Sequence, residues 1–145
     1  MNIHIRLAEK ADIAGIFNVR TSVNENVLSV AELADMGITP ESVFAMIAAE
    51  PCAWVAVENE TIVGFSMIAQ EEGSLFAAFV LPSHEGRGVG RSLVNEAEKH
   101  LFARHTACWL ETGSTTRAAG FYRRLGWSNE QDAGNGDIRL EKRRP

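Results

Sequence analysis

The chain has 145 residues, of which 46% are hydrophobic, and its formal net charge is −5. This length and apolar content favour a single domain over residues 1–145 with one well-filled core. No apolar run approaches the roughly 20 residues that span a bilayer, and the acidic balance disfavours nucleic acid, which proteins bind through Lys and Arg. Because no signal-peptide pattern opens the chain, we expect a cytoplasmic protein with neither membrane nor nucleic-acid partners.

The two cysteines, Cys52 and Cys108, each lie within an apolar run. Buried cysteines of cytosolic proteins usually stay reduced, so no disulfide is expected. No CxxC or HxxxH spacing occurs, and we therefore expect no metal site.

The first third of the chain carries one strand pattern and three helix patterns. Ile3, Ile5 and Leu7 alternate with polar residues, which predicts a half-buried strand. Ser29 and Thr39 are capping residues, and each precedes apolar residues at helical spacing. We therefore expect a strand over residues 2–8 and a helix from about 12 to 20. A short helix should follow, carrying Val30, Leu33 and Met36. A third helix should begin at residue 40 and bury Val43, Phe44 and Ile47.

The rest of the chain alternates strands with helices. Two strands joined at Asn59 and Glu60 predict a hairpin, and a later apolar strand stops before Pro82. The expected strands cover residues 52–58, 61–68, 74–81 and 107–112, the expected helices cover 89–104 and 115–125, and two terminal strands flank a polar loop at 129–136. This order predicts one α/β domain with a mixed sheet.

A glycine-rich turn joins the strand that ends before Pro82 to the long helix. Gly86, Gly88 and Gly90 occupy alternate positions where the helix begins. Several backbone N–H groups then point into one concavity at a helix N-terminus, which favours a phosphate or pyrophosphate. The turn is neither a GxxxxGK loop, since it contains no Lys, nor a GxGxxG fingerprint, since Leu93 stands at the sixth position.

Two segments resemble the signatures of the GNAT superfamily of acyl-CoA-dependent N-acyltransferases. Residues 85–90, Glu-Gly-Arg-Gly-Val-Gly, resemble the Q/R-x-x-G-x-G/A signature. Residues 118–127, Ala-x-x-Phe-Tyr-Arg-Arg-Leu-Gly-Trp, resemble the family's A-x-x-L/F-Y-x-x-x-G-F/W helix and turn. The order of elements is also similar over essentially the whole chain, which looks like a small bacterial member.

The resemblance implies an α/β (α+β) fold with a mixed, mostly antiparallel central sheet flanked by helices, and acetyl-CoA or coenzyme A as co-substrate. It implies that backbone amides of the turn hold the pyrophosphate and that the end of the preceding strand pairs with the pantetheine arm. The implied cofactor-binding residues are Phe79, Val80, Leu81, Arg87, Gly88, Val89, Gly90 and Arg91.

The resemblance also implies an N-acetyltransferase that moves an acetyl group from acetyl-CoA to a primary amine by direct attack in a ternary complex. Tyr122, the only tyrosine, stands at the position of the family's tyrosine and would protonate the departing thiolate. A base must deprotonate the acceptor ammonium. Glu111 is the first candidate, Glu72 and Glu25 are alternatives, and a water relay that needs no single carboxylate stays open.

The acceptor pocket is expected between residues 21–36 and the loop 129–136. Asn24, Glu25 and Asn26 would contact an amine there, or are ordinary turn residues. An acidic pocket would suit polyamines or Lys, and a hydrophobic one would suit aryl amines, so the acceptor stays open. A homodimer is equally open, since small members of the superfamily often form one.

Two positions depart from the signatures. Glu85 stands where Gln or Arg is usual, and we expect its carboxylate to point to solvent, away from a pyrophosphate. Thr115 stands where an Asn is frequent. Both favour the alternative of a non-catalytic acyl-CoA-binding sensor or partner module. An acetyltransferase acting on aminoacyl-tRNA is disfavoured by the acidic net charge.

Overall fold

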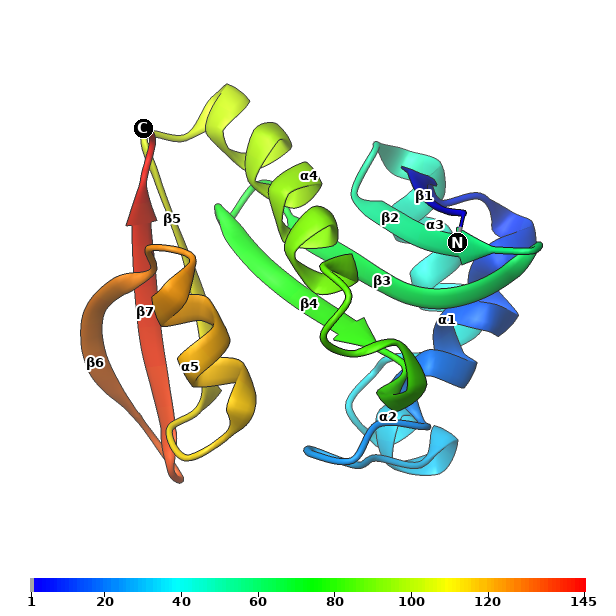
Figure 1. The fold of residues 1–145 in the computed structure, drawn as a ribbon, viewed down its shortest axis with the longest axis horizontal. Helices are drawn as coiled ribbons and strands as arrows, with labels where there is room; N and C mark the ends of the chain where they lie inside the picture. The colour runs from blue at the N-terminus through cyan, green and yellow to red at the C-terminus, as the bar shows by residue number, and fades with distance from the viewer. Residues whose placement is uncertain (1) are drawn as a thin grey trace.

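The predicted strands pair into one mixed sheet of seven strands in the computed structural model, which describes residues 2–145 (Figure 1). The strands are β1 (Ile3–Leu7), β2 (Ala53–Glu58), β3 (Thr61–Ala69), β4 (Ser74–Val80), β5 (Ala107–Gly113), β6 (Ser128–Gly134) and β7 (Asp137–Arg143). The helices are η1 (Lys10–Asp12), α1 (Ile13–Arg20), α2 (Val30–Asp35), α3 (Pro40–Ala49), η2 (Pro82–His84), α4 (Val89–Arg104) and α5 (Arg117–Arg124). The strand order is β1-β2-β3-β4-β5-β7-β6, and within residues 2–145 only the β4–β5 pair is parallel. The fold class predicted from the sequence is confirmed.

Helices cover both faces of the sheet (Figure 1). Successive residues of a strand point to opposite faces, so neighbouring residues of β3 contact different helices. On β3, Phe65 and Met67 share a pocket with apolar side chains of α1. Their neighbours face α4: a Cβ added to Gly64 would lie 3.0 Å from the Leu93 side chain, and the Ser66 hydroxyl donates to the Leu93 carbonyl over 3.0 Å. No helix within residues 2–145 combines the length and apolarity needed to cross a membrane.

The parallel pair β4–β5 separates soon after it begins. Ser74 and Trp109 are paired, and the Trp109 amide donates to the Gly73 carbonyl over 3.1 Å. Beyond this point the two strands diverge (Figure 1). On the other side of β4 the register with β3 shifts, so that Phe76 has no partner. A bulge of this kind bends a strand and increases its twist, and here it lies where β4 leaves β5.

Local signals read from the sequence form the predicted caps and turns. Ser29 and Glu32 form a reciprocal capping box at the start of α2, and the Thr39 hydroxyl caps α3. Asn59 and Glu60 both adopt positive φ, at 49° and 66°, in the β2–β3 hairpin.

The predicted polar loop at residues 129–136 is wrong. Most of this stretch belongs to β6, whose side chains are all exposed and which pairs with β7 through two register shifts. The connection to β7 is a tight turn at Asn135 and Gly136, with φ of 55° and 82°. An edge strand that faces water on both sides has no apolar alternation, so its composition is that of a loop.

Phe44 also differs from expectation, because its side chain is 39% exposed although the helical pattern places it on the buried face of α3. The Lys10 ammonium lies 5.2 Å from the centre of the Phe44 ring. Val43 alone is fully buried on this helix, so α3 packs along a narrower stripe than the sequence suggests.

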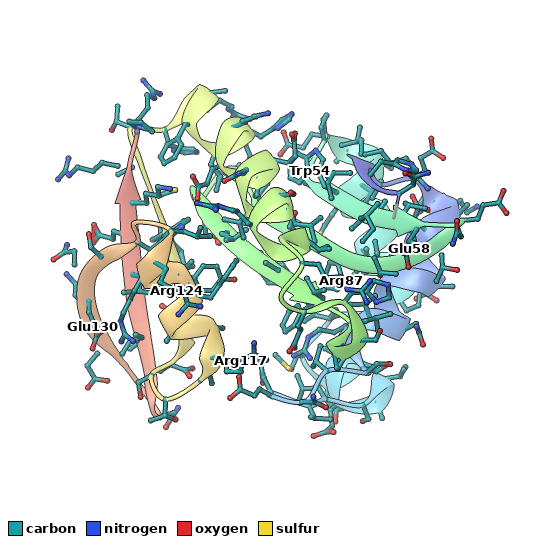
Figure 2. All side chains as sticks on the ribbon, in the orientation of Figure 1. Trp54, Glu58, Arg87, Arg117, Arg124 and Glu130 are labelled. Carbon is teal, nitrogen blue, oxygen red and sulfur yellow. The ribbon has the colours of Figure 1, made fainter. Side chains whose placement is uncertain are left out.

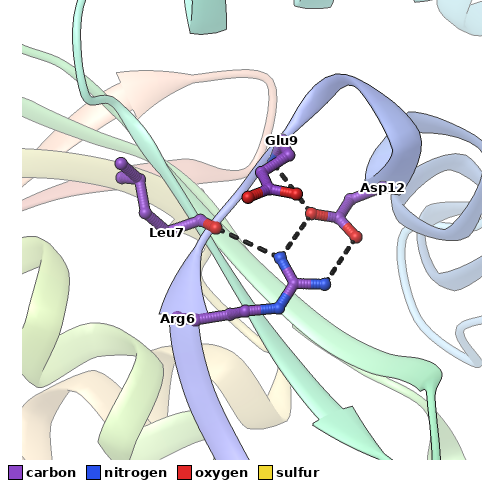
Figure 3. A network of polar contacts seen from close by, with 4 residues as sticks. All are labelled: Arg6, Leu7, Glu9 and Asp12. Atoms are coloured by element: carbon purple, nitrogen blue, oxygen red, sulfur yellow. Dashed lines mark hydrogen bonds and ion pairs between the residues drawn. The ribbon is translucent and has the colours of Figure 1, made fainter.

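A buried carboxylate ties β1 to the first helical turn (Figure 3). Asp12 accepts two hydrogen bonds from the Arg6 guanidinium, at 2.7 and 2.9 Å, and one from the Glu9 amide at 2.8 Å. The Arg6 hydrogen bonds hold the pKa of Asp12 below its usual value. Hydrogen bonds to a charged group contribute about 1.5–3 kcal/mol each, and this network fixes the direction in which α1 leaves the sheet.

Candidate functional site

The glycine-rich turn has the geometry of an anion site. After β4 ends, η2 leads to Gly86 and Gly88, whose φ angles are 76° and 81°. Gly88 is the left-handed residue directly before α4. A Cβ at either position would meet no atom within 4 Å. The turn therefore requires glycine for its backbone conformation, not for lack of space.

Backbone N–H groups at the start of α4 are available to a ligand. The Ser92 amide donates to the Gly88 carbonyl over 3.1 Å and is the first in the helical series. The amides of Val89, Gly90 and Arg91 precede it and have no acceptor within the helix. Together with the helix dipole they favour an anion of phosphate type. A Cβ at Gly90 would lie 3.4 Å from the Phe121 ring, an ordinary contact distance, so the packing of α5 beside α4 does not itself require this glycine.

Glu85 is exposed, as expected from the sequence, and it forms a surface ion pair with Arg117. Arg117 begins α5, and its backbone amide also donates to the Glu25 carboxylate over 2.9 Å. Arg117 thus joins the turn before α4 to the segment before α2 (Figure 2). His84 anchors the same turn to β2 through Glu58 at 2.8 Å. The role of Arg117 could not be predicted from the sequence, because its two partners are distant in the chain.

The end of β4 has one paired side and one open side. Phe79 and Val80 pair with Phe65 and Gly64 of β3, and the Leu81 amide donates to the β3 residue Val63 over 2.9 Å. On the side of β5, the described residues show no ladder partner for β4 after Ser74. Its backbone is therefore free to pair with an extended ligand, immediately before the turn.

Tyr122 lies on α5 and is 7% exposed. Its ring contacts Phe121 and Trp127, with centroid distances of 5.3 and 6.1 Å. Trp127 is held in turn by a hydrogen bond to the buried Glu98 carboxylate, at 3.2 Å. Burial raises the pKa of the Tyr122 phenol well above its usual value. The side chain is therefore a fixed phenol that keeps its proton at neutral pH.

The three candidate carboxylates lie at different places. Glu25 accepts a hydrogen bond from the first amide of α5. Glu72 lies in the turn before β4, at the end where β4 and β5 are still paired, and it is exposed. Glu111 is exposed on β5, opposite Arg139 of β7. The structure brings Glu25 to the helix of Tyr122 and does not group the three carboxylates. The described residues contain no group of three metal-ligating side chains.

Sheet register places Glu111 on a particular face. Ala69 pairs with Ser74, and Ser74 pairs with Trp109. Because paired residues and residues two apart share a face, Glu111 and Trp109 lie on the face of β3 that carries Met67. This is the face covered by α1.

A pocket of about 180 Å³ lies on that same face. Its walls are mostly apolar side chains from α1, α2, α3, β3 and β4, including Phe17, Leu33, Phe65 and Phe79. Asn26, Leu33 and Met36, which belong to the expected segment 21–36, line the pocket, but no residue of 129–136 does. Arg20, which the sequence did not single out, stands in its wall.

Several solved structures have a similar fold. The PaiA N-acetyltransferase of Thermoplasma acidophilum, solved with coenzyme A, has a TM-score of 0.81 at 20% identity and covers 99% of this chain and 100% of that one. The yncA protein of Salmonella typhimurium, solved with acetyl-CoA, has a TM-score of 0.73 at 19% identity, with 99% and 94% covered. The ribosomal-protein-S18-alanine N-acetyltransferase of Escherichia coli has a TM-score of 0.71 at 20% identity, with 98% and 94% covered.

These likenesses show that the chain shares the fold of the acetyltransferase structures named above. The chain belongs to the acetyltransferase (GNAT) family, whose model matches residues 16–127. No curated protein matches the chain in sequence. The matched region runs from α1 to Trp127 and contains the turn, the open edge of β4 and Tyr122.

Neither cysteine is placed to act as a nucleophile. Cys52 and Cys108 are free and buried. Burial raises the pKa of Cys52, and burial together with the Glu98 carboxylate raises the pKa of Cys108 to about 12. Since the thiolate is the reactive form, a covalent acyl-cysteine route is disfavoured.

The native thiols are therefore expected to react slowly with a colorimetric disulfide reagent at pH 8. A pKa near 12 for Cys108 lowers its thiolate fraction about a thousandfold relative to an ordinary cysteine. In denaturant both thiols should react at the ordinary rate. Rapid reaction of either cysteine in the native protein would contradict the burial described above.

Proposed function

We propose that the protein transfers an acetyl group from acetyl-CoA to a primary amine by direct attack in a ternary complex. The observation that carries this proposal is the open edge of β4 leading into unpaired amides at the start of α4. That arrangement occurs in a chain that belongs to an acetyltransferase family, and two proteins of similar fold were solved with coenzyme A or acetyl-CoA.

Backbone groups would hold most of the cofactor. The pyrophosphate would lie against the amides of residues 87–91, with charge-assisted hydrogen bonds of about 1.5–3 kcal/mol each. The pantetheine arm would pair with the free side of Phe79, Val80 and Leu81 as an added strand. Arg87 and Arg91 would add positive charge near the phosphates.

In the transfer step the free amine attacks the thioester carbonyl carbon, a C–N bond forms and the C–S bond breaks. The sulfur leaves as a thiolate and Tyr122 donates its phenolic proton to it, while the proton lost from the attacking nitrogen, as it becomes the amide, restores the phenol. The raised pKa of Tyr122 keeps that proton available across neutral pH. The burial that disfavours phenolate also disfavours thiolate, so the transfer between them need not be strongly uphill.

The ammonium proton of the acceptor must leave before the attack. Glu111 lies on the face of the pocket, and Glu25 lies at the start of α5. Glu111 remains the first candidate for the base, acting directly or through water, with Glu25 next. Glu72, at the closed end of the split, is the least favoured.

The function is tested by mixing the protein with acetyl-CoA and a panel of polyamines, aryl amines, amino acids and peptides. We expect release of free thiol and a matching N-acetylated product, each dependent on one class of amine. Tight binding of coenzyme A without turnover of any amine would contradict the proposal and favour the non-catalytic module.

Tyr122→Phe is expected to lower kcat about a hundredfold, the usual loss on removing a general acid. The ring contacts are retained in this variant, so the dissociation constant of coenzyme A should stay within about twofold and the melting temperature should change little. Steady-state kinetics and calorimetric titration measure the two quantities. An unchanged kcat would remove Tyr122 from the mechanism.

The Glu85–Arg117 pair predicts opposite effects on cofactor affinity. Glu85→Gln removes a negative charge beside the proposed pyrophosphate site and leaves Arg117 to face the phosphates, so coenzyme A should bind about fivefold more tightly at low salt. Arg117→Gln leaves Glu85 unneutralised and should weaken binding by a similar factor.

The double variant is expected to lie near the wild type, because it removes both charges. Glu130→Gln is a matched control, since the Arg123–Glu130 pair is a similarly exposed ion pair elsewhere on the surface. Calorimetric titration of coenzyme A into each variant, at two salt concentrations, provides the measurement. Weaker binding by Glu85→Gln would show that the carboxylate helps to hold the turn.

A further inference from the structure

Arg20 is a partly buried arginine without an acidic partner. It ends α1, and one of its guanidinium nitrogens, Nη1, donates to the Asn26 carbonyl over 2.9 Å. The guanidinium carbon lies 4.3 Å from the centre of the Phe79 ring. Among residues 2–145, no carboxylate forms a salt bridge with Arg20, in contrast to Arg6, Arg104, Arg117 and Arg123.

No opposite charge compensates Arg20 for the part of its hydration that burial removes. A charge that leaves water is normally compensated by a partner of opposite charge. Burial lowers the pKa of Arg20, and no acidic neighbour raises it. A guanidinium has five N–H donors in a planar fork, and the single bond to Asn26 leaves most of them free. The fork is suited to a carboxylate, which it binds through two parallel hydrogen bonds.

The rest of the pocket is suited to an apolar group. Apolar side chains from five elements form its walls around about 180 Å³, and an apolar cavity of about 150 Å³ is large enough to hold a benzene molecule. Met36 and Phe76, which also line the pocket, are 63% and 50% exposed. Two large apolar side chains thus remain partly uncovered at this site.

The pocket adjoins the proposed transfer site. Phe79 belongs both to the pocket wall and to the open edge of β4. Asn26 lines the pocket, and the preceding residue, Glu25, binds the first amide of the Tyr122 helix. A molecule beside Arg20 therefore lies between the β4 edge and the segment that contacts α5.

We propose that the acceptor is a free apolar α-amino acid, whose carboxylate binds the Arg20 guanidinium and whose side chain fills the pocket. This inference rests on the proposed acetyl transfer and names the acceptor class for it. Polyamines would be repelled by Arg20, whereas simple aryl amines and peptide N-termini lack the α-carboxylate. Of these classes, only a free amino acid carries an amine, a carboxylate and an apolar group on one carbon atom.

The test is calorimetric titration of the protein saturated with coenzyme A, which cannot turn over. The probes are L-phenylalanine, L-leucine and L-methionine, each compared with its carboxamide, and glycine. We expect at least one amino acid to bind at least tenfold more tightly than its carboxamide and than glycine. Equal affinity for acid and amide, or no binding of any of the three amino acids, would overturn the proposal.

Variants of Arg20 test whether its side chain causes the preference for the amino acid over its carboxamide. Arg20→Gln should abolish the preference for acid over amide while changing amide affinity by less than about twofold, and Arg20→Lys should keep part of it. Arg104→Gln, which alters an exposed arginine paired with Glu50, is the matched control and should keep all of it. A full preference in a folded Arg20→Gln protein would overturn the proposal.

Thiol release from acetyl-CoA separates this inference from the proposed function. An amino acid that binds through Arg20 and also releases thiol supports both. An amino acid that binds with the expected preference but releases no thiol supports the pocket assignment and contradicts acetyl transfer to it. Turnover of polyamines or carboxamides in preference to amino acids would support acetyl transfer and overturn the assignment.

Discussion

The divergence of β4 from β5 is the constraint on which the rest of the structure depends. Parallel strands normally satisfy each other's backbone groups along their whole length, but here one pair, Ser74 and Trp109, holds the closed end. The register shift at Phe76 bends β4 at the same place. The open edge of β4 leads straight into the N-terminus of α4, and the coenzyme proposed above would pair with both.

Side chains then bridge the open end of the split. Arg117 reaches Glu85 with its guanidinium and Glu25 with its amide, so three segments far apart in the chain meet at the start of α5. This pairing changes the meaning of the unusual carboxylate in the first signature. Glu85 brings a negative charge to the turn, but Arg117 neutralises it. Having Glu at a signature position where Gln or Arg is usual is therefore weaker evidence for a non-catalytic module than the sequence alone suggests.

Local physical chemistry made most of the fold predictable from the sequence. The caps at Ser29 and Thr39, the hairpin at Asn59 and the glycine-rich turn each depend on residues within a few positions of one another. The failures have the opposite character. The exposure of Phe44 and the pairing of β6 depend on what packs against them. The pairing of Glu85 joins residues 32 positions apart, and Arg20 stands out only because no acidic partner reaches it. Such features belong to the assembled molecule, and no short pattern encodes them.

Arg20 also bears on how the acceptor ammonium loses its proton. A positive charge fixed beside an α-amino acid would neutralise the substrate's own carboxylate, which otherwise stabilises the neighbouring ammonium. Burial in an apolar pocket lowers the ammonium pKa further. Both effects would raise the fraction of free amine at neutral pH, so that an exposed carboxylate such as Glu111, or water, could accept the proton. On this argument one arginine would serve recognition and activation together, and a buried base next to Tyr122 would not be required.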